Sequence, residues 1–150
     1  MYGHFRTTVR AGFVGLLTLT APGPVLDETP HNTTESTLAE TQAAAVTPLL
    51  TKALKDISGK EVLMLTVEYQ PGGTDPVHRH NAHAFIYVLE GSIVMQVQGG
   101  PQVTLNPGQT FYEGPDDIHA VGRNASSTKP ARFVVFFVKG AGSPPVVPVP

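Results

Sequence analysis

The sequence predicts an all-β protein, built as a small barrel or sandwich of short strands. The chain has 150 residues, 41% of them hydrophobic and 15% charged, a balance typical of one globular domain. It contains 15 Gly and 14 Pro residues, which suit many short strands joined by turns and argue against a helical bundle. It has no Cys, which excludes disulfides, thiolate metal ligands and a cysteine nucleophile.

Runs of apolar and β-branched residues that end at turn residues mark the individual strands. In chain order, the predicted strands are residues 61–69, 77–80, 83–90, 93–98, 102–105, 110–113, 118–123 and 131–139. The turns between them contain Pro71-Gly72-Gly73, Gly91-Ser92, Gly99-Gly100-Pro101, Asn106-Pro107-Gly108, Gly114-Pro115-Asp116 and the polar stretch 124–130. The runs 83–90 and 131–139 are apolar at both alternate positions, which predicts strands covered on both faces or lying at a subunit contact.

The first residues are expected to be a secretory signal peptide that precedes the fold. Arg6 and Arg10 come before a short apolar run, residues 11–21, which is followed by a Pro-Gly-Pro break. A bilayer span needs about 20 apolar residues, so no stable membrane span is expected here. The protein is therefore expected in the periplasm or outside the cell, or in the cytoplasm if this leader is not a signal peptide. The predicted organisation is a signal peptide at 1–21, a flexible linker at 22–47, a barrel at 48–139 and a Pro-rich extended tail at 140–150.

Charge and motif content exclude several classes of function. The formal net charge is −2, and no run of Lys and Arg forms a basic footprint, so no nucleic-acid partner is expected. The chain also lacks a P-loop and a GxSxG nucleophile motif. The expected partner is a small-molecule substrate.

The histidines carry the clearest chemical signal. His78 and His80 lie two residues apart on a predicted strand, so both side chains leave the same face. Two imidazoles on one face can ligate one divalent ion. The alternative is a pair of surface histidines beside a turn.

The surrounding spacing resembles the two sequence motifs of the cupin superfamily, small jelly-roll barrels (double-stranded β-helices) that hold a metal ion. The segments GGTDPVHRHNAHAFIYVLEG and GQTFYEGPDDIHAVGRN carry this resemblance, which spans residues 61–139. It implies a cupin barrel in which His78, His80 and His119 hold one divalent transition metal ion per chain (Fe, Mn, Ni or Zn). It also implies a homodimer.

The sequence departs from the family pattern at one ligand position. The family's Glu ligand falls on Ala84, and the Pro and Gly of the second motif fall on Gly114 and Asp116. A site of three His without the carboxylate would be one unit more positive and would favour an anionic or enolate-like ligand.

Nearby residues could replace the missing carboxylate. His83, Glu113 and Gln96 are candidates for a fourth ligand or a general base. The alternatives are a rim histidine, a carboxylate that caps a turn and a polar strand face. Ala84, Tyr87 and Tyr112 are predicted to line the cavity.

Three classes of function fit these residues. The favoured one is a metal-dependent enzyme, a dioxygenase-type cupin that acts on a small enolisable or phenolic compound. The alternatives are a redox-neutral, metal-dependent isomerase or lyase, and a non-catalytic barrel that binds a small ligand or a metal. Fold alone does not distinguish the three.

Overall fold

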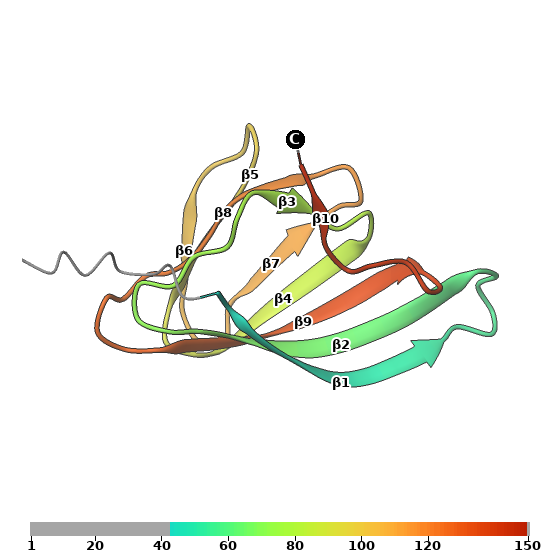
Figure 1. Cartoon of the computed structure of the whole chain (residues 1–150), viewed down its shortest axis with the longest axis horizontal. Coiled ribbons are helices and arrows are strands. Elements are labelled where there is room, and N and C mark those ends of the chain that lie inside the picture. Colours follow the sequence, from blue (N-terminus) through green and yellow to red (C-terminus); the bar gives the residue numbers. More distant parts are fainter. Residues whose placement is uncertain (1–42, 150) are drawn as a thin grey trace, which may run out of the picture. The chain divides into compact units, whose positions relative to one another are not determined.

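Two five-stranded antiparallel sheets face each other in the computed structural model, which describes residues 43–149 (Figure 1). In spatial order, the first sheet contains β1 (Ala45–Ala53), β2 (Lys60–Tyr69), β9 (Ala131–Gly140), β4 (His83–Glu90) and β7 (Thr110–Glu113). The second contains β10 (Val147–Pro148), β3 (His78–Arg79), β8 (Ile118–Asn124), β5 (Ile93–Val97) and β6 (Val103–Leu105). This is the all-β jelly roll that the sequence predicts, and the fold class is confirmed.

The eight predicted strands correspond to β2 through β9, and the structure adds one strand at each end. β1 begins at Ala45, inside the stretch expected to be a linker, and pairs along its length with β2. Its residues are all exposed, and Pro48 stands beside a register shift, which an edge strand tolerates because an edge amide needs no partner. The expected signal peptide and most of the expected linker lie outside the described residues.

The core lies between the two sheets and is filled by alternate residues of each strand. On β4, Ala84, Ile86 and Val88 point inward and are buried. Phe85 and Tyr87 point outward and are 48% and 47% exposed, so the described residues cover only one face of β4. The strand is apolar on both faces, yet only one of them belongs to the core.

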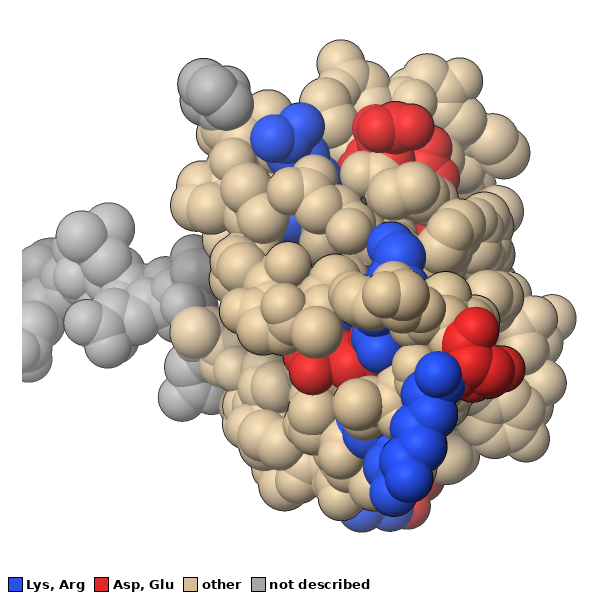
Figure 2. Space-filling model, turned by 90° about the vertical axis from the view of Figure 1, so that its right-hand side faces the viewer, with Lys and Arg blue, Asp and Glu red and all other residues tan. Residues whose placement is uncertain are grey.

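The described surface carries no extended field of one charge on the face that Figure 2 shows. Basic and acidic side chains are interspersed there among a larger area of uncharged residues. Within residues 43–149, no helix is long and apolar enough to cross a membrane.

Candidate metal centre

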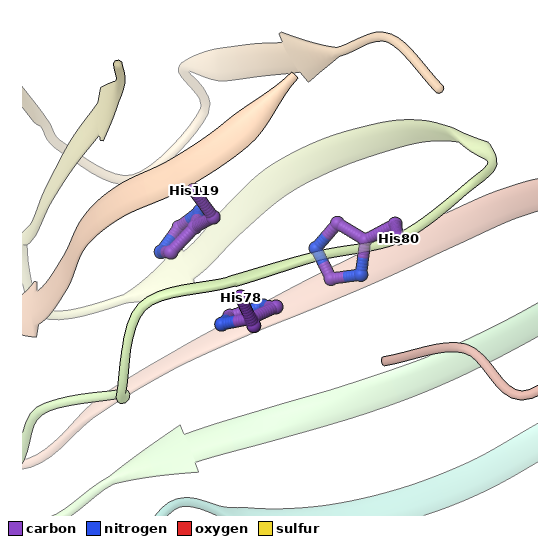
Figure 3. Close-up of side chains that lie close together, drawn as sticks. All are labelled: His78, His80 and His119. Atoms are coloured by element: carbon purple, nitrogen blue, oxygen red, sulfur yellow. The ribbon is translucent and has the colours of Figure 1, made fainter. Parts of the chain in front are cut away.

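Three histidines meet on the inner side of the second sheet. His78 lies on β3, His80 follows that strand directly, and His119 lies on β8, where it is the antiparallel partner of His78 (Figure 3). One ring nitrogen of each lies within 4.8 Å of those of the other two. The three residues are 6%, 9% and 2% exposed. The two-residue spacing of His78 and His80 and the pairing of β3 with β8 therefore bring the three predicted ligands together.

Each of these imidazoles is anchored through Nδ1. His78 Nδ1 bonds the Pro76 carbonyl oxygen and His80 Nδ1 bonds the Pro145 carbonyl oxygen, each at 2.7 Å, while His119 Nδ1 bonds a Glu113 carboxylate oxygen. A carbonyl oxygen only accepts hydrogen bonds, so Nδ1 of His78 and His80 carries the proton. With Nδ1 as the donor, Nε2 is the ring atom that each neutral imidazole can offer to a metal ion, although His80 Nε2 also lies 3.1 Å from a Glu113 carboxylate oxygen. Outer oxygen acceptors of this kind orient histidine ligands in metal sites.

His119 Nε2 and its surroundings fit a bound ion. This atom is buried and has no hydrogen-bond partner among the described residues, whereas buried polar atoms are normally satisfied. The space in front of it exists because residue 122 is glycine: a Cβ atom there would clash with His119 Nε2. The donor set, three imidazoles beside a carboxylate, is one that first-row divalent ions accept.

A Gly122→Ala variant is expected to lose at least about tenfold in metal affinity, because its methyl group occupies the space that His119 Nε2 faces. Competition against a chromogenic chelator measures the affinity, and far-UV circular dichroism checks the sheets. Unchanged metal affinity in a folded variant would show that Nε2 does not face the ion.

Glu113 supplies a carboxylate close to the position from which the family's Glu is missing. It lies on β7 directly opposite Ala84 of β4. Facing residues of an antiparallel pair have Cβ atoms about 4.5–5.5 Å apart, so a side chain can reach the same region from either strand. Glu113 is buried, bonds His119 Nδ1 through one oxygen and lies 3.1 Å from His80 Nε2 through the other.

Electrostatics favour a charged carboxylate and a neutral imidazole at this site. Burial alone would raise the pKa of Glu113, but its hydrogen bond with His119 and its contact with His80 outweigh burial and lower the pKa to about 2. Burial lowers the pKa of His78, which favours the neutral form that ligates a metal. The expectation of a site one unit more positive than the family's is therefore wrong, because Glu113 restores the negative charge.

The remaining predicted site residues lie elsewhere. His83 is exposed and its Nδ1 bonds the Tyr112 hydroxyl oxygen at 2.8 Å on the outer face. Gln96 donates to the Gly100 carbonyl oxygen in its own turn. Tyr87 and Tyr112 do not line the cavity, because alternation along β4 and β7 turns them outward. Ala84 faces the interior but is packed in the core, outside the cavity wall.

The histidines open onto a cavity of about 170 Å³ with mainly apolar walls. The wall residues that the sequence analysis missed include Tyr69, Asp75 and the tail residue Pro145. Tyr69 shares the inward alternation of Leu65 and Val67, which could have placed it inside. Nothing local marks Asp75 or Pro145, because their positions depend on contacts with distant strands.

The tail continues past β9 and closes onto the histidines. Lys139 Nζ donates to the Ser143 carbonyl oxygen at 2.6 Å, and β10 then pairs with β3. A chain ending at residue 142 is expected to bind metal about 10–100-fold more weakly, because His80 loses the Pro145 acceptor that orients it. Chelator competition measures the loss, and a chain ending at residue 148 is the control. Equal affinity of the two shortened chains would show that the tail has no part in the site.

Two facing sheets with a buried three-histidine cluster define a small β-barrel whose interior can hold a metal ion. The cupin-domain family model matches residues 65–137. With the fold described above, this match places the chain in the cupin superfamily, and the resemblance of its two motifs is confirmed.

Solved structures support the same assignment. An oxalate oxidase in complex with the substrate analogue glycolate is 26% identical, with a TM-score of 0.54 over 69% of this chain and 54% of that one. The DMSP lyase DddQ from Ruegeria pomeroyi DSS-3 is 20% identical, with a TM-score of 0.55 over 69% and 50%. An uncharacterized protein with a double-stranded β-helix domain from Klebsiella pneumoniae is 15% identical, with a TM-score of 0.57 over 73% and 89%.

The last two similarities show the fold alone. The chain spans about half the length of the oxidase and of the lyase. No curated protein sequence matches it.

Proposed function

We propose that the protein is a metal-dependent cupin enzyme that acts on a small organic substrate, with oxygen-dependent chemistry. The observation that carries this proposal is the set of three imidazoles, each held by an oxygen at Nδ1, beside one apolar cavity. The likeness to an oxalate oxidase favours an oxygen-dependent reaction over a redox-neutral one.

The residues of the site would have different roles. His78, His80 and His119 would hold a divalent ion, which when bound supplies Lewis acidity and open positions for substrate oxygens. Glu113 lies beside His80 Nε2 and fixes His119, so it can complete the ligand set or accept a substrate proton. The apolar walls would strengthen the polar contacts of a ligand that fills the cavity.

The cavity favours a substrate that is small and largely apolar. Its volume is about 170 Å³, and a cavity of roughly 150 Å³ accommodates benzene. The apolar part of the wall includes Leu65, Val67, Ile86, Phe133, Val135 and Phe137. These walls fit a phenolic or enolisable compound with a hydrocarbon body better than a small dicarboxylate such as oxalate.

The test combines metal analysis with a substrate screen. Protein purified without chelator or affinity nickel is analysed for Fe, Mn, Ni and Zn by mass spectrometry, then screened for oxygen uptake with phenols and diketones. Near one ion per chain with oxygen consumption supports the proposal. Turnover without oxygen favours a redox-neutral isomerase or lyase, and metal-dependent binding without turnover favours a binding barrel. Failure to bind metal after reconstitution rejects the proposal.

Assembly and export are further parts of this proposal. Phe85, Tyr87 and Tyr112 expose about half of their surface on the outer face of β4 and β7, and a second copy of the chain would cover them. Sedimentation of the purified protein tests for this homodimer. Export rests on the leader alone, and N-terminal sequencing of protein recovered from each cell fraction tests it.

A further inference from the structure

A second polar feature lies in the cavity wall, apart from the metal cluster. Tyr69 is the last residue of β2; its side chain is fully buried, and its hydroxyl donates a hydrogen bond to the Asp75 carboxylate. Both residues line the same cavity as the three histidines. Neither belongs to the group that could hold the ion, and Tyr69 follows two inward-facing apolar residues of its strand, Leu65 and Val67.

The backbone holds this pair in place. The Asp75 amide donates to the Gly122 carbonyl oxygen at 2.8 Å, and Thr74 bridges to Arg123, so the loop is fixed to β8. A Cβ atom on Gly122 would clash with His119 Nε2 and would also lie 2.9 Å from the Tyr69 hydroxyl oxygen. The hydroxyl and the orphaned nitrogen therefore face the same small space, and a ligand at the histidines would lie beside the pair.

The pair can accept a hydrogen bond but has no proton to offer. The single hydroxyl proton of Tyr69 goes to Asp75, and burial raises the pKa of Tyr69, so the hydroxyl stays protonated. Asp75 receives this bond on Oδ2, which leaves Oδ1, and the phenolic oxygen keeps its own lone pairs. A ligand group that contacts the pair must therefore be a hydrogen-bond donor.

We propose that Tyr69 and Asp75 form a recognition site that selects ligands with a neutral hydroxyl group on an apolar body of about benzene size. The inference rests on the proposed function, because the pair lines the cavity of the proposed metal centre. A neutral donor fits better than a cation, since a divalent ion would already balance the carboxylates of Glu113 and Asp75. Ligands without a donor make no hydrogen bond to the second Asp75 carboxylate oxygen and so bind more weakly.

Phenol and anisole are matched probes for this site. The two rings have the same size, but the methoxy group of anisole has no proton to donate. Each probe is titrated into ¹⁵N-labelled protein, as purified and again after chelator treatment, and amide shifts give the affinity and locate the binding site. Wild type is expected to bind phenol at least about tenfold more tightly than anisole in both forms, because only phenol can donate a hydrogen bond to the Asp75 carboxylate.

Two variants test whether Asp75 and Tyr69 cause the preference for phenol over anisole. Asp75→Asn is expected to bring the affinity ratio to one or below, because the amide of the new side chain donates toward the ligand. Tyr69→Phe keeps the ring that packs on Phe133 and is expected to weaken phenol binding several-fold with little effect on anisole. Tyr87→Phe, which removes a hydroxyl from the outer face, is the matched control and should change neither affinity.

The outcomes separate this inference from the proposed function. Equal affinities in wild type, binding of neither probe, or an unchanged preference in Asp75→Asn would each overturn the recognition site. A preference found only with metal bound would also overturn it, because the ion would then be the selecting group. If the protein takes up no metal even on reconstitution and still prefers phenol, the pair is supported and the metal-dependent function is rejected. The wild-type comparison stands even if a variant fails to fold.

Discussion

A His119→Ala variant is expected to contain almost no metal, where wild type contains near one ion per chain. Losing a direct ligand should cost more than the roughly 10–100-fold in affinity that loss of an outer partner costs. His78→Ala should behave in the same way, because the two side chains face each other across β3 and β8. Mass spectrometry of metal content per chain, after purification without chelator, measures the effect.

His83→Ala provides the matched control for this prediction. His83 is close to the cluster in sequence, but its ring lies on the outer face against the Tyr112 hydroxyl. Its replacement should leave the metal content at the wild-type value. Full metal content in both His78→Ala and His119→Ala, or its loss in His83→Ala, would show that the ligands are assigned wrongly.

Moving the carboxylate from Glu113 to position 84 is expected to preserve most of the metal affinity. Glu113→Ala alone should weaken metal binding by about 10–100-fold, because His119 loses its Nδ1 partner. Ala84→Glu alone should destabilise the fold by about 1–3 kcal/mol, since Ala84 is fully buried between Phe137 and Glu113 and has no room for a second carboxylate. In the double variant the two changes should compensate each other.

A double-mutant cycle measures this compensation. Chelator competition reports metal affinity, and chemical denaturation reports the free energy of unfolding of each variant. Glu90→Gln, which removes an exposed carboxylate from the same strand as Ala84, is the control. If the double variant binds metal no better than Glu113→Ala, then the two positions do not serve one site, and Glu113 has a role that a carboxylate on β4 cannot replace.

Much of the fold could be predicted because its signals are local. Apolar runs broken by Gly and Pro marked β2 through β9, and the spacing of His78 and His80 placed both rings on one face. β1 was not predicted because it is exposed along its whole length and contains Pro48, so it lacks the alternation that marks a half-buried strand. β10 was not predicted because a strand of two residues in a Pro-rich tail shows no periodicity.

The candidate site could be predicted only in part. The sequence pointed to Glu113 as one of three replacements for the missing carboxylate and favoured it over Gln96, but it did not place Glu113 ahead of His83. The pairing of β4 with β7 distinguishes Glu113 from His83, because it sets Glu113 opposite Ala84, while alternation along β4 turns His83 outward. The same alternation excludes Tyr87 and Tyr112 from the cavity, since each points to the outer face.

The fold class, the three histidines and the absence of the family's Glu at position 84 could thus be predicted from residue order and spacing. Three features required the folded chain: Glu113 lies opposite Ala84, the Pro145 carbonyl oxygen of the tail bonds His80, and Tyr69 bonds Asp75 in the cavity wall. The reason is physical. Residue order and periodicity set which way a side chain points along its own strand, whereas the neighbours it meets depend on strand registers between segments far apart in the chain.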